Sequence, residues 1–170
     1  MLPSVQCIFI GDSSVGKTAL IKNATHQLLP RLPTAGVDMV TYTSKKIRLQ
    51  CWDTSGQPRF KHILRMFIKS CAAVVYVFDA TDDNSFDSIL QWHEQLQYLD
   101  KIFIVICNKA DLPAAKTAKY RLKMSHEWPE IPFIVSSAFM NAVEVMEEVV
   151  KLLPHPEQPE VQQIECCVIV

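Results

Sequence analysis

Residues 11–18 read Gly11-Asp12-Ser13-Ser14-Val15-Gly16-Lys17-Thr18, which matches the phosphate-loop pattern G-x-x-x-x-G-K-[ST] at every fixed position. An apolar run at residues 5–10 precedes the loop and predicts a buried strand. A helical pattern follows it, from Lys17 to about Gln27. Because this loop binds phosphate between a strand and a helix, both the pattern and its setting predict a phosphate site.

The residue types in this loop suit that chemistry. Gly11 and Gly16 let the backbone turn so that the N–H groups of residues 12–16 point toward phosphate oxygens. The start of the helix adds its positive end. Lys17 can reach the β- and γ-phosphates, and the Thr18 hydroxyl can bind magnesium. The alternative is an ordinary glycine turn with a surface lysine.

Composition narrows the class of protein. The chain has 170 residues, enough for one domain with a proper core, and its formal net charge is −1 with no basic stripe. Nucleic acid is therefore not an expected partner. The N-terminus shows no secretion signal, and the longest apolar run, residues 71–78, is too short to span a membrane. Cysteines 7, 51, 71 and 107 lie in apolar segments, so we interpret them as buried residues in a reducing, cytoplasmic compartment.

The rest of the chain alternates strands and helices. Further strands are predicted at residues 38–43, 47–52, 72–79, 102–107 and 132–135. Further helices are predicted up to about residue 69 and at residues 85–99, 116–126 and 141–153. This order predicts an α/β fold: an open, mostly parallel six-stranded sheet with one antiparallel edge strand and about five flanking helices. Polar motifs follow directly after several strands, so we expect them to meet at the carboxyl edge of the sheet, where such sheets bind ligands.

The motif order resembles that of a Ras-superfamily small GTPase. The phosphate loop is followed by Thr34-Ala35-Gly36, by residues 53–57 (DTSGQ), by residues 108–111 (NKAD) and by Ser137-Ala138. The resemblance covers residues 5–153 and implies the P-loop NTPase fold. Residues 36–38, 52–57 and 79–86 are most similar to the Rab branch. We therefore expect residues 1–153 to form one GTPase domain.

The resemblance implies roles on the phosphate side of the site. Asp53 would hold magnesium through water, together with the hydroxyls of Thr18 and Thr34. Thr34 would close over the γ-phosphate, which makes its segment the first switch. Gly56 would bring an N–H to the γ-phosphate at the start of the second switch. Gln57 would orient the attacking water, so Gln57, Thr34 and Lys17 are the expected catalytic residues.

The base side of the site should select guanine. Guanine presents two adjacent N–H groups, which the carboxylate of Asp111 can accept together, whereas adenine would leave that carboxylate unpaired. The resemblance implies that Lys109 lies along the base and that Asn108 ties this segment to the phosphate loop. It also implies that Ala138, between Ser137 and Phe139, donates its N–H to the guanine oxygen. An ordinary polar loop at residues 108–111 is the alternative.

Three positions depart from the family pattern. No aromatic residue lies between Phe9 and Tyr42, where the family usually stacks one on guanine. Phe139 stands where a lysine is usual, so we expect nucleotide to leave faster than from a typical relative, unless Phe139, Leu28 or Leu29 covers the base. Pro58 follows Gln57 and favours extended geometry at that glutamine.

Residues 154–170 change character and read as a flexible tail rich in proline, glutamine and glutamate. The final four residues, from Cys167 to Val170, fit the lipidation pattern C-a-a-X, with Cys167 as acceptor. One lipid anchors weakly, and the tail has no Lys or Arg, so Cys166 is the expected second attachment. An apolar chain end is the alternative. The prediction is a peripheral protein on the cytosolic face of a membrane.

Together these features predict a monomeric, guanine-nucleotide-dependent switch that binds GTP or GDP with magnesium and hydrolyses GTP slowly. The resemblance implies a role in membrane or vesicle traffic. Its expected partners are an exchange factor, a GTPase-activating protein and effectors of the two switch segments. A nucleotide-binding protein with little turnover is the alternative, which Pro58 favours. Asp111 disfavours an ATP-using kinase.

Overall fold

The structure is a computed structural model that describes residues 2–29, 34–57 and 61–154. Strands and helices alternate along the chain as the sequence predicts. The strands are β1 (Ser4–Ile10), β2 (Val37–Thr43), β3 (Arg48–Thr54), β4 (Ala73–Asp79), β5 (Ile102–Asn108) and β6 (Phe133–Val135). The helices are α1 (Lys17–Ala24), α2 (Lys61–Ser70), α3 (Asp83–Leu96), α4 (Thr117–Glu127) and α5 (Ala142–Leu152).

The strands form one six-stranded sheet in the order β2-β3-β1-β4-β5-β6. The edge strand β2 runs antiparallel to β3, and the other neighbouring pairs are parallel. A tight turn joins β2 to β3, in which the Ser44 N–H donates to the Ile47 carbonyl at 3.0 Å. The predicted mixed sheet, with its single antiparallel edge, is therefore confirmed.

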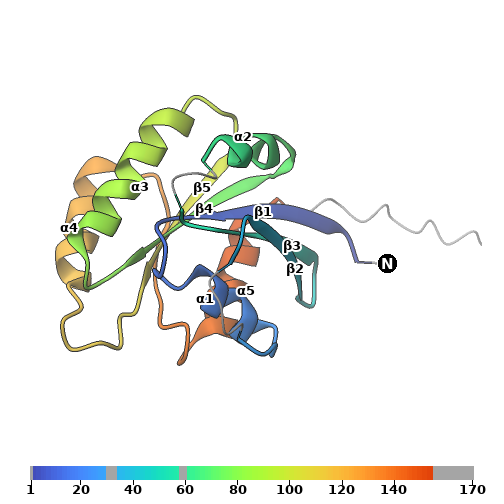
Figure 1. Cartoon of the computed structure of the whole chain (residues 1–170), viewed down its shortest axis with the longest axis horizontal. Helices are drawn as coiled ribbons and strands as arrows, with labels where there is room; N and C mark the ends of the chain where they lie inside the picture. Colours follow the sequence, from blue (N-terminus) through green and yellow to red (C-terminus); the bar gives the residue numbers. More distant parts are fainter. Residues whose placement is uncertain (1, 30–33, 58–60, 155–170) are drawn as a thin grey trace, which may run out of the picture.

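Helices cover both faces of the sheet (Figure 1). Helices α1 and α5 pack on one face, and α2, α3 and α4 pack on the other. Alternate residues of β4 serve the two layers: Val75 and Val77 pack on the α1–α5 side, and Tyr76 and Phe78 pack on the opposite side. Burial on both faces explains why the central strands are apolar without alternation.

Helix α1 is shorter than predicted, because it ends at Ala24 and not near Gln27. His26 adopts a left-handed backbone with φ of 55°. The N–H of Gln27 then donates to the Lys22 carbonyl at 2.9 Å, and the N–H of His26 donates to the Asn23 carbonyl at 3.1 Å. This pair of bonds is a Schellman motif, which ends a helix by satisfying its last carbonyls.

Helix α3 begins two residues earlier than predicted, at Asp83, and ends at Leu96. The side chain of Asp82 caps its start by accepting the Asn84 N–H at 3.0 Å. The four cysteines predicted to be buried are all free and buried. Within the described residues, no helix is long and apolar enough to cross a bilayer.

Candidate functional site

The phosphate loop, residues 11–18, connects β1 to α1 at the carboxyl edge of the sheet. Gly16 has a φ of 99°, a left-handed conformation that side chains disfavour. A Cβ at Gly16 would also overlap the amide nitrogen of the Asn108 side chain. Glycine is therefore required at this position, both for the turn and for close contact with the loop that follows β5.

Lys17 points back over the phosphate loop. Its ammonium donates to the carbonyls of Gly11 at 2.9 Å and Asp12 at 2.7 Å. Burial lowers the pKa of Lys17 to about 8, and the carboxylates of Asp53 and Asp12 oppose that shift only in part. The nearby carboxylates offset the cost of burying this ammonium only in part, so an added anion would stabilise it. This position therefore suits a phosphate group.

Three oxygen-bearing side chains meet beside the phosphate loop. Oγ1 of Thr18 lies 2.7 Å from Oγ1 of Thr34 and donates to Oδ2 of Asp53 at 2.6 Å. The Thr34 hydroxyl donates to the same carboxylate oxygen at 3.2 Å. The three residues come from α1, from the segment before β2 and from β3. The structure thus brings together the three residues predicted to hold magnesium.

Asp53 has a carboxylate oxygen that is free to bind a cation. Its other carboxylate oxygen, Oδ1, is buried and has no hydrogen-bond partner among the described residues. Burial raises the pKa of Asp53, against the opposing effects of Thr18, Lys17 and Thr34. Within the described residues no cluster of three or more His, Cys, Asp or Glu side chains could hold a metal. One carboxylate with two hydroxyls fits Mg²⁺, which keeps water and phosphate ligands as well.

Gly56 lies directly against the phosphate loop. A Cβ at Gly56 would overlap the backbone of Asp12 and Ser13, so only glycine allows this approach. The N–H of the preceding residue, Ser55, donates to the Gly36 carbonyl at 2.7 Å. This bond joins the segment of Thr34, the predicted first switch, to the residue just before Gly56, where the predicted second switch begins.

Gln57 is half-buried, and its backbone N–H lies 3.4 Å from the Ser55 hydroxyl oxygen. The proline that follows, Pro58, lies outside the described residues. The catalytic role of Gln57 therefore stays a prediction.

Asn108, the last residue of β5, connects the phosphate loop to the base side. Its amide nitrogen donates to the Val15 carbonyl at 2.8 Å, as predicted for its tie to the phosphate loop. Its amide oxygen accepts the Ala138 N–H at 3.1 Å. The N–H predicted to meet the guanine oxygen thus donates to Asn108 in this structure. A single side chain joins segments that follow β1, β5 and β6.

Two residues in this network carried no sequence prediction. Asn23 of α1 donates its side-chain amide to the Ala138 carbonyl at 2.7 Å. Asp79, at the end of β4, places Oδ2 2.6 Å from the ammonium of Lys109. The position of Asp79 at the end of an apolar strand was the signal that could have indicated a role in the site, whereas Asn23 lies within a helix and gave no such signal.

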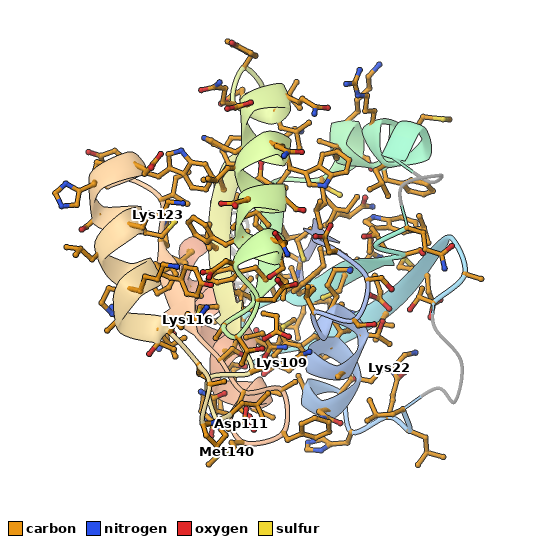
Figure 2. All side chains as sticks on the ribbon, turned by 60° about the vertical axis from the view of Figure 1, so that its left-hand side comes forward. Lys22, Lys109, Asp111, Lys116, Lys123 and Met140 are labelled. Atoms are coloured by element: carbon orange, nitrogen blue, oxygen red, sulfur yellow. The ribbon has the colours of Figure 1, made fainter. Side chains whose placement is uncertain are left out.

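The remaining base-side residues differ in exposure: Asp111 is exposed and Lys109 is half-buried. Asp111 and Lys109 lie in the segment after β5, at the lower end of the molecule in Figure 2. Phe139 is 74% exposed, Leu28 is 95% exposed and Leu29 is 42% exposed, so cover of the base by any of them stays a prediction. Ser137 is buried, and its N–H donates to the Asn141 side chain at 2.8 Å. Cys166 and Cys167 lie outside the described residues.

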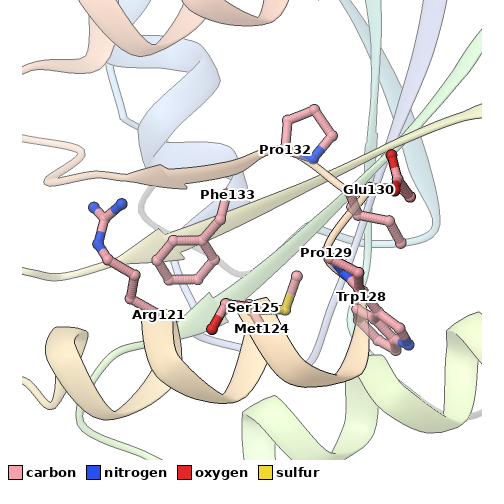
Figure 3. A pocket seen from close by; sticks show the side chains of 9 residues that line it. Arg121, Met124, Ser125, Trp128, Pro129, Glu130, Pro132 and Phe133 are labelled. Carbon is pink, nitrogen blue, oxygen red and sulfur yellow. The ribbon is translucent and has the colours of Figure 1, made fainter.

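A separate pocket of about 400 Å³ lies between α4 and the loop before β6 (Figure 3). Trp128, Pro132 and Phe133 line it, with Arg121 at one side. None of the predicted site residues contributes to its lining. It is therefore distinct from the site that the phosphate loop organises.

Comparison with known proteins agrees with this geometry. The profile of the Ras family matches residues 6–155. The chain is 35% identical to the Ras-related protein Rab-39A of Mus musculus over 124 residues, which is 64% of the chain. It is 32% identical over 144 residues to the GTP-binding protein ypt1 of Schizosaccharomyces pombe, and likewise to the Ras-related protein Rab-1A of Dictyostelium discoideum.

These matches differ in coverage. The similarity to ypt1 and to Rab-1A takes in 77% of the chain and 70% of each relative. The matched part spans only 57% of Rab-39A. Since the family profile covers most of the sequence and includes every motif from the phosphate loop to Ala138, the chain belongs to the Ras family and is similar to its Rab-named members.

Proposed function

We propose that this protein is a guanine-nucleotide-dependent switch that binds GTP or GDP with magnesium and slowly hydrolyses GTP. The observation that carries the proposal is the meeting of Thr18, Thr34 and Asp53 beside the phosphate loop. This cluster joins the first switch segment to the loop that would hold the phosphates. A site of this kind can respond to the presence of a γ-phosphate.

On the phosphate side, residues 11–16 would offer backbone N–H groups, and Lys17 would give its ammonium to the β- and γ-phosphates. Thr18, Thr34 and Asp53 would hold magnesium, whose positive charge would offset that of the phosphate oxygens. Gly56 would contribute an N–H near the γ-phosphate. Gln57 would then orient the attacking water.

On the base side, Asp111 would accept the two adjacent N–H groups of guanine, and Lys109 would lie along the ring. Asn108 supports this arrangement, because it links the phosphate loop to the loop of Ser137, Ala138 and Phe139. A guanine nucleotide would thus bridge two loops that the protein already holds together. Loss of nucleotide is therefore expected to loosen both.

Family membership supports a role in membrane or vesicle traffic, with an exchange factor, a GTPase-activating protein and effectors as partners of the two switch segments. We also propose that residues 154–170 form a linker with lipids on Cys167 and Cys166, which would hold a monomer on the cytosolic face of a membrane. This part rests on the C-a-a-X pattern and on the apolar composition of residues 166–170.

The nucleotide that copurifies with the protein tests the proposal directly. We expect GDP or GTP, released when magnesium is chelated, because the magnesium cluster and the phosphate loop act on the same ligand. Denatured protein can be analysed by anion-exchange chromatography against nucleotide standards. Retention of an adenine nucleotide, or of none even after loading with GDP, would contradict the assignment.

Hydrolysis needs its own experiment, because a nucleotide-binding protein with little turnover is the second candidate and Pro58 favours it. Intrinsic single-turnover hydrolysis should proceed on the order of 10⁻⁴ to 10⁻³ s⁻¹. Gln57→Leu should lower that rate while leaving GDP affinity unchanged. If Gln57→Leu hydrolyses GTP as fast as the parent protein, the glutamine is out of position and the second candidate gains support.

A further inference from the structure

Asp79 lies beside the base side of the site, and the sequence assigns it no role there, although it begins the stretch 79–86 that resembles the Rab branch. It ends β4 and is paired in register with Asn108 of β5. Its Oδ2 lies 2.6 Å from the ammonium of Lys109, and the two side chains are 13% and 32% exposed respectively. A carboxylate that is this poorly exposed holds its partner more firmly than a surface ion pair would.

The carboxylate of Asp79 is itself held rigidly. Its Oδ1 accepts the backbone N–H of Thr81 at 2.9 Å and the Thr81 hydroxyl at 2.7 Å. The backbone N–H of Asp79 donates to the Ser85 hydroxyl oxygen at 3.0 Å. Burial by itself would raise the pKa of Asp79, but the hydrogen bonds from Lys109 and Thr81 outweigh it and lower that pKa. Asp79 is therefore ionised at neutral pH.

Lys109 has an unusual backbone that fits a fixed role. Its φ is 60°, in the left-handed region that residues with side chains seldom adopt. Hydrogen bonds on either side hold this conformation: the Leu112 N–H donates to the Lys109 carbonyl at 3.2 Å, and the Ala110 N–H donates to the Ser136 carbonyl at 3.0 Å. The backbone of Lys109 is thus constrained, while its four-carbon stem would have many rotamers if its ammonium were free.

We propose that Asp79 is a positioning residue for nucleotide binding, because it holds the ammonium of Lys109 and so orients the lysine stem along the face of the base. This inference rests on the proposed function, since it presumes a guanine nucleotide beside Lys109. Asp79 acts only through Lys109. A lysine stem that is already oriented loses less entropy when nucleotide binds. Removal of Asp79 should therefore lower nucleotide affinity and raise the rate of nucleotide release.

The direct test measures release of mant-GDP in excess magnesium from Asp79→Asn. This substitution keeps the shape of the side chain and removes its charge, and release should be about three to ten times faster. Asp83→Asn is the matched control. Asp83 also carries an ion-paired carboxylate, 2.7 Å from Lys116 and 2.6 Å from Lys119, but it is more exposed and lies away from the predicted site. Its release rate should equal that of the parent protein.

A double-mutant cycle separates positioning from general support of the fold. In a Lys109→Ala background, Asp79→Asn should cause no further acceleration, because the stem that it orients is gone. An equal acceleration in both backgrounds, or an unchanged rate in Asp79→Asn alone, would overturn the proposal.

A milder variant keeps the test decisive if Asp79→Asn folds poorly. Thr81→Val removes only the hydroxyl that braces Oδ1 of Asp79, and it should speed release by a smaller factor that also vanishes in the Lys109→Ala background. An unchanged rate in Thr81→Val would then count against the proposal. A parent protein that fails to bind mant-GDP would instead refute the proposed function, so the two failures are distinguishable.

Discussion

Single residues carry most of the chemistry of this site, and their surroundings differ sharply between its two sides. On the phosphate side, Lys17 and Asp53 are buried and embedded in hydrogen bonds. On the base side, Asp111 and Phe139 are exposed. Substitutions on the phosphate side should therefore disturb packing as well as binding, whereas base-side substitutions test recognition more cleanly.

Asp111→Asn should exchange base preference. The Asp111 carboxylate accepts two N–H groups of guanine, whereas an asparagine side chain offers one acceptor oxygen and one N–H donor. Pairing with guanine is therefore lost. Pairing with xanthine is gained, because xanthine carries a carbonyl in place of the guanine amino group. GTP affinity should fall by at least about a hundredfold, with a gain for xanthosine triphosphate. Competition binding with both nucleotides measures this exchange. Unchanged GTP affinity would exclude Asp111 as the guanine-selecting residue.

Phe139→Lys should slow nucleotide release. The resemblance implies that a lysine at this position would lay its stem beside the base, whereas the phenyl ring of Phe139 is exposed. Stacking of an aromatic ring on a base contributes about 1–3 kcal/mol in other proteins, and a lysine stem offers less contact, so release should slow by at most roughly tenfold. Mant-GDP release in excess magnesium is the measurement.

The matched control for that change is Leu122→Lys. Leu122 is also exposed, at 63%, but lies on α4. The Leu122→Lys variant adds the same charge without approaching the base, and it should release mant-GDP at the same rate as the parent protein. A parent protein that already retains mant-GDP for many hours would mean that another side chain covers the base.

Among the elements, α3 is joined to its neighbours by an unusual contact. His93 is buried on the sheet-facing side of α3, with its Nδ1 3.4 Å from the Tyr76 hydroxyl. Its ring packs against Phe103 of β5 and Trp128, with ring centroids 4.9 Å and 4.4 Å apart respectively. An aromatic environment of this kind favours a neutral imidazole, because a charged ring would lose its hydration.

His93 should therefore make the fold sensitive to mild acid. Burial lowers the pKa of His93 in the folded state below that in the unfolded chain. The unfolded state then binds the proton more readily, so the free energy of unfolding should fall as pH drops through the unfolded pKa toward the folded one. His93→Gln should flatten this dependence between pH 7.5 and about 5.

Urea denaturation at several pH values measures this effect. His126→Gln is the control, because it replaces an exposed histidine on α4 and leaves the buried contacts of His93 in place. The prediction is wrong if His93→Gln loses stability with acid as steeply as the parent does.

The nucleotide-binding motifs and the proposed membrane anchor occupy separate parts of the chain. The described part ends at Pro154, just beyond α5, and holds the complete set of nucleotide motifs. Residues 154–170 contain no Lys or Arg and three glutamates. Attraction of this segment to anionic lipids is therefore not expected, and any membrane attachment through it has to be hydrophobic.

Cys167→Ser should release the protein from membranes in eukaryotic cells, and Cys166→Ser should weaken its retention. Fractionation of cell lysates into membrane and soluble parts measures both. Washing with raised salt should release little of the parent protein, because its tail has no basic residues to screen. Strong release by salt, or full retention of Cys167→Ser, would show that the attachment is not a lipid on Cys167.

Local sequence determined most of the elements and the kind of site. Strands such as β4 are continuous apolar runs, and residues 11–18 carry a pattern whose backbone geometry is inseparable from its glycines. The C-terminal end of α1 could not be predicted from the sequence, because His26 holds the left-handed position that ends the helix, and the usual signal at that position is glycine.

Tertiary structure alone decided which distant residues complete the site. Asn108 meets Val15 across 93 positions of sequence, and Asn23 meets Ala138 across 115. The bond from Asp79 to Lys109 depends on β4 lying next to β5 in register. Sequence patterns extend over one element at a time, whereas these contacts arise only when burial of both sheet faces fixes the strand order and brings the carboxyl ends together.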